Sequence, residues 1–389
     1  MTAHAPRKVI FAPFMTGFGG VERLVLGLSR FLDEQLEPHC VLTFSNSIDL
    51  QSYSDSPVDV VVLASPRNPI LEALALRRWT SAEAAATGST DPVLVFDLRG
   101  AFYASLLSVP FAVHVTDPPS LLSADVSKHA PSRTKLWGNA LLQPGKALRA
   151  ETTNYLNKRG LARATTLIAM TERISREIRE LYDRDAVVIR PGVMPPAQRS
   201  PRPVHAGVRF LSISRLVSSK RIDWVLDATA EAKETFEREG IEWSLQIVGS
   251  GPELDRLAAQ SRRLGLDRNV VFSGGVDQAG LEEAYDAASV FLMPAAQGWG
   301  LPALEALSRG VPVVVHEDSG VTEILTDSPW VERISDPDGR DLAGAMVRIA
   351  NRVNGRELEN ISPPAIPLER EWAEKICVAC SWLPNEVGR

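Results

Sequence analysis

Short apolar runs alternate with amphipathic segments of helix length along the chain. In the first half, these runs predict strands at Lys8–Ala12, His39–Thr43, Val58–Leu63, Val93–Phe96, Phe111–Val115, Thr166–Ala169 and Ala186–Ile189. After the first run, apolar side chains fall on one stripe of a helix predicted over Val21–Leu32. Continuous apolar strands that alternate with amphipathic helices predict parallel sheets covered by helices on both faces.

A proline-rich segment interrupts this pattern between residues 191 and 207, as is typical of a linker. A second series of strands follows, predicted at Val208–Ser212, Ser244–Val248, Val270–Ser273, Val290–Met293 and Pro312–Val315. We therefore expect an α/β protein with two doubly wound, Rossmann-like domains, residues 1–194 and 195–370. A closing helix, predicted over Glu371–Leu383 within residues 371–389, is expected to pack back on the first domain. The Ala-, Ser- and Thr-rich stretch Thr80–Thr90 is expected to be a surface loop.

The composition is that of an ordinary folded protein. Its 389 residues are 44% hydrophobic and 23% charged, and the net charge of -6 argues against nucleic acid as a partner. Cys377 and Cys380 form a CxxC pair that no second pair of zinc ligands follows, and Cys40 stands alone, so buried thiols are favoured over a zinc or redox site. We find no secretory signal and no apolar stretch of the ~18 residues that a membrane span needs. A cytoplasmic protein that at most touches a membrane from that side is expected.

Candidate chemistry lies in four loops that follow predicted strands, because open parallel sheets bind ligands outside the carboxyl ends of their strands. The first loop holds Gly17, Gly19 and Gly20 before a helix, where backbone amides can approach an anion. Its spacing is not the G-x-G-x-x-G of dinucleotide binding, and a tight turn that binds nothing is the alternative. A second glycine turn carries Gly249 and Gly251, and no acidic residue ends the next strand, which argues against NAD.

The other two loops carry charged side chains. Arg215 and Lys220 follow the strand at Val208–Ser212, and both can aim cationic donors at a diphosphate, although a solvated basic loop is the alternative. The fourth loop leads into a helix, so the backbone amides of Gly298–Leu301 can face a phosphate at the helix N-terminus. Glu305 follows one turn later. Its carboxylate can accept hydrogen bonds from a ribose diol, or it can simply complement the helix dipole.

Together these loops resemble the retaining, GT-B-fold glycosyltransferases called glycosyl transferases group 1, most strongly from about residue 208 to residue 325. The order and spacing match in the Arg-Lys loop, the Gly-x-Gly-Pro-Glu turn, the strand end Phe272–Gly274 and the E-x7-E region. The resemblance implies a GT-B fold whose two domains face a central cleft, with the acceptor on the first domain and a nucleotide diphosphate-sugar donor on the second. It further implies a hexose-type sugar, a glycan, glycolipid or natural-product acceptor, retention of anomeric configuration, and neither metal nor cofactor.

The resemblance also implies site residues, position by position. Arg215 and Lys220 would hold the donor diphosphate and neutralise the leaving group, and Glu305 would bind the nucleotide ribose. His114, at the end of a predicted strand, would lie near the donor sugar. Glu323 is a weaker match to an acidic residue after the family's next strand. The remaining donor contacts would come from Gly19, Gly20, Gly249, Gly251, Gly298, Trp299, Gly300 and Leu301.

One position departs from the family pattern. The first glutamate of E-x7-E is Gln297 here, and an amide keeps hydrogen bonding but supplies no full negative charge. A catalytically weak or inactive nucleotide-sugar-binding relative is therefore the alternative function. Two D-x-D pairs, Asp183 with Asp185 and Asp336 with Asp338, have the spacing of a metal site, but both are expected to be turn or capping residues.

The basic segment 128–163 is the remaining candidate feature. It is rich in Lys and Arg, it contains a single acidic residue, Glu151, and apolar residues are interleaved. In an acidic protein, this pattern predicts contact with anionic membrane or with a lipid-pyrophosphate acceptor, and a solvated face is the equally weighted alternative.

Overall fold

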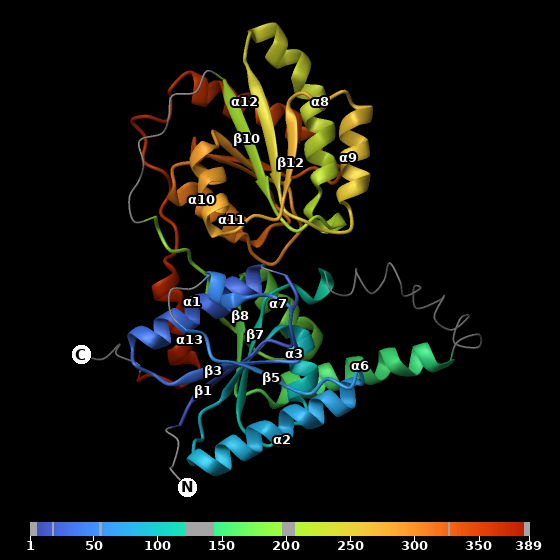
Figure 1. The fold of residues 1–389 in the computed structure, drawn as a ribbon, viewed down its shortest axis with the longest axis vertical. Coiled ribbons are helices and arrows are strands. Elements are labelled where there is room, and N and C mark those ends of the chain that lie inside the picture. The colour runs from blue at the N-terminus through green and yellow to red at the C-terminus, as the bar shows by residue number, and fades with distance from the viewer. Residues whose placement is uncertain are drawn as a thin grey trace. The chain divides into compact units, whose positions relative to one another are not determined.

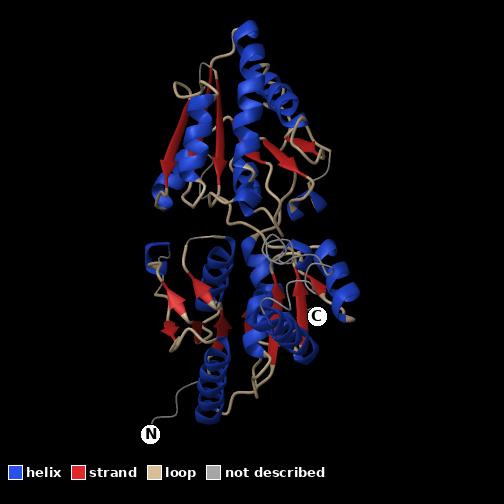
Figure 2. Cartoon of the chain, turned by 90° about the vertical axis from the view of Figure 1, so that its right-hand side faces the viewer, coloured by secondary structure: helices blue, strands red, loops and turns tan. Residues whose placement is uncertain are grey.

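The computed structural model describes residues 6–17, 19–53, 57–121, 144–196, 207–325 and 327–384. The chain divides into two compact units, Met1–Pro191 with Glu369–Arg389, and Gly192–Leu368. These divisions lie within three residues of the boundaries expected from the sequence, at 194 and 370. Each unit contains a parallel sheet with helices packed against it (Figures 1 and 2).

The first unit is built on a seven-stranded parallel sheet in the order β5-β3-β1-β6-β7-β8-β9. Its strands are β1 Lys8–Phe11, β3 His39–Thr43, β5 Val60–Val62, β6 Val93–Phe96, β7 Phe111–Val115, β8 Thr166–Ala169 and β9 Val187–Val188. A separate two-stranded sheet pairs β2, Phe14–Met15, with β4, Ser45–Asn46. Every residue of β6 and β7 is buried, which agrees with strands covered on both faces.

The described helices of this unit are α1 Gly20–Glu34, α2 Pro69–Thr87, α3 Asp97–Ala104, α6 Pro144–Arg163, α7 Glu172–Tyr182 and α13 Glu369–Ala379, with a 3-10 turn at Leu50–Tyr53. The loop expected at Thr80–Thr90 is wrong, because α2 continues through most of this stretch. The Asn68 side chain accepts from Ile70 N at 3.0 Å to cap the start of α2, and Gly88 ends the helix in the left-handed region at φ 70°. Between these caps, the alanines favour helix.

Helix α13 returns the end of the chain to the first unit. Trp372 of α13 is buried, and the Arg30 guanidinium of α1 donates to both carboxylate oxygens of Glu369, at 2.8 and 2.9 Å. Gly27 makes this approach possible, because a Cβ there would lie 2.6 Å from the Glu369 carboxylate. All three cysteines are free and buried, which confirms the predicted thiols.

The second unit is a six-stranded parallel sheet in the order β12-β11-β10-β13-β14-β15. Its strands are β10 Val208–Ile213, β11 Trp243–Val248, β12 Val270–Gly274, β13 Val290–Met293, β14 Val313–His316 and β15 Val331–Ile334. Its helices are α8 Ile222–Glu239, α9 Leu254–Arg263, α10 Gln278–Ala287, α11 Leu301–Ser308 and α12 Asp341–Asn354, with 3-10 turns at Ser218–Lys220 and Gly320–Glu323. A core cluster joins β10 to α8 and α12 through Phe210, Phe236 and Met346.

The strand order of this sheet locates its ligand-binding edge. From β10 the chain proceeds outward to β11 and β12, and it then crosses back to β13, β14 and β15 on the other side. The switch point lies between β10 and β13, and open sheets of this kind bind ligands beyond the strand ends at such a point. Both the Arg-Lys loop and the Gln297 loop begin at this point. Within the described residues, no helix has the length and apolar character that crossing a bilayer requires.

Candidate functional site

Three loops meet at the carboxyl ends of β10, β13 and β14. Ala296 N donates to Ser219 O at 2.9 Å, which joins the β13 loop to the β10 loop. Gln297 N donates to Asp318 O at 3.3 Å, and Gly320 N donates to Gln297 O at 3.1 Å, which joins the β13 loop to the β14 loop. These backbone bonds hold the three segments in one arrangement, as a preorganised site needs.

The side chains of Lys220 and Gln297 meet within this arrangement. The Lys220 ammonium donates to Gln297 Oε1, although the two residues are 77 positions apart in the sequence. Gln297 Nε2 donates to Met293 Sδ at 3.1 Å and to Ser319 Oγ at 3.3 Å, and the Ser319 hydroxyl donates to Trp299 O at 2.7 Å. The structure therefore brings together two of the predicted site residues, and it adds Ser319, which the sequence motifs did not single out.

Arg221 is a second residue that the motifs did not assign. Its guanidinium donates to Asp318 Oδ2 at 2.5 Å and to Pro294 O at 3.2 Å, and it stacks over the Trp224 ring at 4.2 Å. The backbone of Arg221 is in the left-handed region, at φ 54°. Arg221 thus ties the three loops together from the position next to Lys220, and its place directly after that lysine was the only signal in the sequence.

Glu305 is held by an aromatic hydroxyl. Helix α11 begins directly after Gly300, and Glu305 lies half-buried in its second turn. The Tyr285 hydroxyl contacts Glu305 Oε2 at 2.7 Å and Pro302 O at 3.2 Å. A carboxylate fixed by such a hydrogen bond presents its remaining lone pairs in a defined direction, which suits recognition of a diol.

Arg215 and the two glycines of the β11 loop form the other side of the edge. The Arg215 side chain is exposed, and within the described residues it has no hydrogen-bond or ion-pair partner. A Cβ on Gly249, whose φ is 136°, would lie 1.8 Å from Ser214 O, and one on Gly251 would lie 2.3 Å from Leu216 O. In the structure, these glycines allow close packing under the segment that carries Arg215. Their predicted contact with a donor remains a prediction.

In the first unit, Gly19 and Gly20 lie at the start of α1, as the sequence predicted. Gly19 is the N-cap, and its N–H donates to Glu22 Oε2 at 3.1 Å, which is the backbone half of a capping box, since glycine has no side chain to complete it. This amide is therefore engaged by a side chain of its own helix. Among the described residues, no atom lies within 4 Å of a Cβ placed on Gly20.

His114 does not lie on an accessible edge, contrary to the role that the family resemblance implies. It is fully buried in β7, where its ring packs 5.2 Å from Phe96 and 6.0 Å from Trp372, measured between ring centroids. Burial lowers the pKa of His114 to about 4. In this arrangement the imidazole has no exposed surface, and its contact with a donor sugar remains a prediction. The physical reason is that helix α13 covers the face of the sheet on which His114 lies.

A carboxyl group at the same end of the first sheet has an unusual environment. Asp97 directly follows β6 with φ 69°, and its carboxylate accepts from Leu98 N at 2.8 Å. Burial, and then the nearby carboxylate of Asp117, raise the pKa of Asp97 to about 6. The motifs did not predict this group, because its environment depends on the pairing of β6 with β7 and on burial, which a motif does not show.

The D-x-D pairs have structural roles. Asp183 ends α7 in the left-handed region, and Asp185 pairs with Arg179 at 2.5 Å. Asp336 accepts from Asp341 N at 3.2 Å at the start of α12. Across the described part of the chain, no three His, Cys, Asp or Glu side chains are grouped so that they could hold a metal ion.

The basic segment is described only in part. Residues 128–143 lie outside the described residues, and side chains are described only from residue 152 onward. Arg159 donates to Ser105 O at 3.2 Å, and Arg163 donates to Ser105 O at 2.6 Å and to Leu107 O at 2.7 Å. These two arginines therefore satisfy carbonyls at the end of α3, while Lys158 is exposed.

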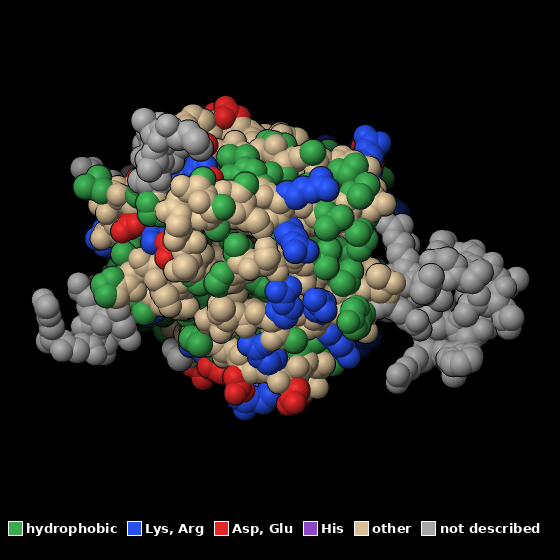
Figure 3. Space-filling model, turned by 90° about the horizontal axis from the view of Figure 1, so that it is seen from below, with side chains coloured by type: hydrophobic (Ala, Val, Ile, Leu, Met, Phe, Trp, Pro, Cys, Tyr) green, Lys and Arg blue, Asp and Glu red, His purple; other side chains and the backbone are tan. Residues whose placement is uncertain are grey.

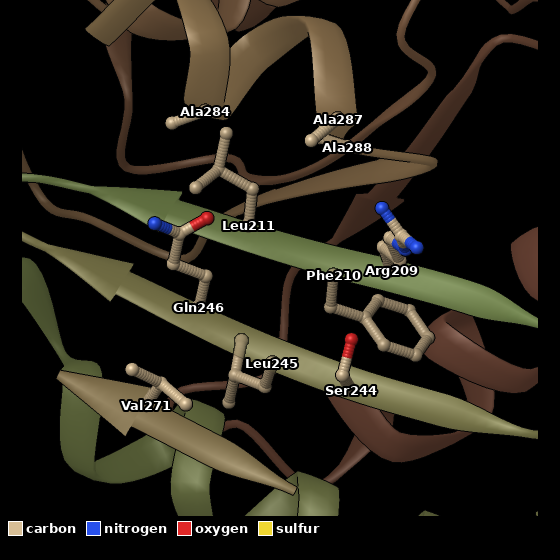
Figure 4. Close-up of a pocket in the computed structure, with 10 residues that line it drawn as sticks. All are labelled: Arg209, Phe210, Leu211, Ser244, Leu245, Gln246, Val271, Ala284, Ala287 and Ala288. Atoms are coloured by element: carbon tan, nitrogen blue, oxygen red, sulfur yellow. The ribbon is translucent and has the colours of Figure 1, made fainter. Parts of the chain in front are cut away.

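A shallow groove of about 370 Å³ lies away from the loops, on one face of the second sheet. Arg209 of β10, Gln246 of β11 and Val271 of β12 line it beside helix α10 (Figure 4). None of the predicted site residues lines this groove. The groove is therefore separate from the edge that carries the predicted site residues.

Comparison with solved structures places the fold. The Anabaena protein HepE, solved in complex with UDP and glucose, aligns with 97% of this chain and 100% of its own at a TM-score of 0.66 and 18% identity. Two Rossmann-like units with parallel sheets of this kind define the GT-B fold of glycosyltransferases. The predicted fold class is confirmed.

Comparison of sequences then gives the family. Residues 198–338, which hold the candidate site, match the family described as "Glycosyl transferases group 1". This segment overlaps the one in which the motifs resemble that family most strongly. An exopolysaccharide phosphotransferase of Streptomyces coelicolor is 30% identical over 63% of this chain and 25% of its own length. A GDP-mannose-dependent phosphatidylinositol monomannoside mannosyltransferase of Mycolicibacterium smegmatis is 34% identical over 30% of this chain and 31% of its own length. The match thus spans about a quarter to a third of the length of these curated relatives.

Proposed function

We propose that this protein is a retaining glycosyltransferase that moves a hexose-type sugar from a nucleotide diphosphate-sugar to a glycan, glycolipid or natural-product acceptor, without a metal. The observation that carries the proposal is the meeting of Lys220, Gln297 and the start of α11 at the switch point of the second sheet. The family match covers this segment. The names of the relatives support a nucleotide-linked hexose, since one is GDP-mannose-dependent and HepE was solved with UDP and glucose.

The leaving group explains the choice of residues. When the bond to the anomeric carbon breaks, the nucleoside diphosphate gains negative charge, and preorganised cations and amides lower the barrier most where that charge develops. Arg215 and Lys220 supply a guanidinium and an ammonium at this edge, and the start of α11 supplies the positive end of a helix dipole. Glu305, oriented by Tyr285, would accept hydrogen bonds from the ribose hydroxyls. With the incoming hydroxyl on the face that the leaving group vacates, retention needs no protein nucleophile.

The first unit would bind the acceptor. On its face that carries α2 and α6, Lys and Arg side chains gather beside hydrophobic ones (Figure 3). The exposed cations of the two helices include Arg77, Arg78 and Lys158. Such a face suits an anionic or lipid-linked acceptor and peripheral contact with the inner face of a membrane from the cytoplasm. Co-sedimentation with anionic vesicles that falls as salt rises would support this part of the proposal, and absence of binding would refute it.

Donor turnover by the Lys220→Ala variant tests the proposed function. Removing one preorganised charge from the leaving-group site is expected to lower kcat by about a hundredfold or more. Lys233→Ala is the matched control, because Lys233 lies on α8 in a loose pair with Glu237 at 3.9 Å. Equal turnover by the two variants would contradict the diphosphate assignment. The donor for this assay comes from a thermal-shift panel of UDP-, GDP-, ADP- and TDP-sugars, since a bound ligand stabilises the folded state by mass action.

The same assay separates an enzyme from an inactive relative that only binds nucleotide-sugars. Transfer or hydrolysis of the stabilising donor by the unmodified protein establishes catalysis. If a nucleotide-sugar stabilised the protein but was neither transferred nor hydrolysed, the protein would be an inactive relative that only binds nucleotide-sugars.

A further inference from the structure

Both N–H groups of the Gln297 side-chain amide have a hydrogen-bond acceptor. Nε2 carries two hydrogens, and it has two acceptors, Met293 Sδ at 3.1 Å and Ser319 Oγ at 3.3 Å. Oε1 accepts from the Lys220 ammonium. Exchanging the two ends of the amide would set an NH2 group against that ammonium, so only this orientation satisfies all partners.

The neighbours of Gln297 fit an amide and not a carboxylate. The Ser319 hydroxyl donates its one hydrogen to Trp299 O at 2.7 Å, so it presents a lone pair to Gln297. Met293 Sδ is an acceptor as well. A glutamate at position 297 would place an oxygen against Met293 Sδ, and Ser319 could donate to that oxygen only by giving up its bond to Trp299 O, which is unfavourable in a half-buried site. Gln297 is thus matched to its surroundings and is not simply a glutamate that has lost its charge.

We propose that Gln297 is a positioning residue, which holds the Lys220 ammonium at the diphosphate site and adds no negative charge there. This inference rests on the proposed function, because it gives Lys220 the diphosphate as its ligand. A carboxylate at this distance would form an ion pair with the lysine and would lower the net positive charge at the diphosphate site, whereas the neutral amide holds the same ammonium and leaves its charge uncompensated.

Isothermal titration of the full-length protein tests the inference, with UDP, GDP, ADP and TDP as probes and then with the sugar conjugate of whichever nucleotide binds. Gln297→Ala is expected to weaken binding of the free nucleoside diphosphate about five- to tenfold in the unmodified protein, and by less than about twofold in the Lys220→Ala background. Gln297→Glu is expected to weaken it about tenfold or more. If Gln297→Ala fails to fold, Gln297→Met, which keeps the length of the side chain, takes its place.

Asn354→Asp is the control for added charge. It makes the same amide-to-carboxylate change at the exposed last residue of α12, on the opposite edge of the sheet, and it should bind within about twofold of the unmodified protein.

The outcomes separate this inference from the proposed function. If Gln297→Ala weakened binding of the nucleotide-sugar but not of the free diphosphate, the residue would contact the sugar, and the inference would be overturned while the function stood. Equal binding by Gln297→Glu and the unmodified protein would overturn the argument from charge. An unmodified protein that bound no nucleoside diphosphate would overturn the proposed function and the inference together.

Discussion

Replacing His114 by phenylalanine separates a buried structural histidine from one that binds a sugar. Both ring nitrogens of His114 are buried, and within the described residues neither has a hydrogen-bond partner on another residue. A neutral imidazole carries one N–H, and a buried donor that lacks an acceptor costs about 1–3 kcal/mol. A phenyl ring would keep the contacts with Phe96 and Trp372 and remove this cost. After an allowance for the larger ring, we expect His114→Phe to be more stable by about 1 kcal/mol at pH 7.5.

The pH dependence gives the stronger test. Burial lowers the pKa of His114 to about 4 from an ordinary value of 6.5, so between these pH values the unfolded chain binds a proton that the folded chain does not. The stability that the neutral folded histidine provides is fully present above pH 6.5 and is lost as the pH falls towards 4. The complete loss amounts to about 3 kcal/mol, of which about 2 kcal/mol is reached by pH 5. His114→Phe should lack this contribution.

Urea unfolding of both proteins at pH 7.5 and pH 5, followed by circular dichroism, measures these differences. His39→Phe is the control, because both nitrogens of that buried ring are bonded, to Ser29 Oγ at 2.6 Å and to Glu37 O at 3.1 Å. This variant leaves a hydroxyl unpaired and should lose about 1–3 kcal/mol. An unchanged pH dependence in His114→Phe would refute the argument from burial. A large loss of turnover in the folded His114→Phe variant would instead support a contact between His114 and the donor sugar.

Two further substitutions probe how the site is supported. Tyr285→Phe removes the hydroxyl that contacts Glu305 at 2.7 Å, so the affinity for a nucleoside diphosphate should fall about three- to tenfold by calorimetry, and unchanged affinity would argue against Glu305 as the ribose ligand. Gly249→Ala should cost more than about 2 kcal/mol in thermal unfolding, because its Cβ would lie 1.8 Å from Ser214 O at a φ of 136°. Gly240→Ala, at φ 67° with open space around it, should cost only about 1 kcal/mol, and equal losses would contradict the steric argument.

Strands were the most predictable part of the fold. The bounds predicted for Phe111–Val115 and Val290–Met293 are those of β7 and β13, because a strand buried on both faces is an uninterrupted apolar run. Strand β15, Val331–Ile334, was missed because Glu332 and Arg333 interrupt its apolar pattern. The structure shows why this is tolerated: Glu332 is buried but pairs with two arginines of α12.

The site was predictable as a set of loops but not as a set of contacts. Glycine spacing and paired cations marked the loops after β10 and β13, and the strand order brings their origins together. The hydrogen bond between Lys220 and Gln297 could not be inferred, since it depends on how two loops distant in sequence are joined. The burial of His114 could not be predicted from the sequence for a similar reason, because Trp372, which packs against it, comes from the opposite end of the chain.

A crystal structure with UDP or GDP bound, whichever binds in titration, tests the central claim most directly. We predict the diphosphate at the carboxyl ends of β10 and β13, with the Lys220 ammonium within hydrogen-bonding distance of a phosphate oxygen and Glu305 on the ribose hydroxyls. A nucleotide bound in the groove over β10, β11 and β12, or elsewhere with Lys220 and Glu305 out of reach, would contradict it.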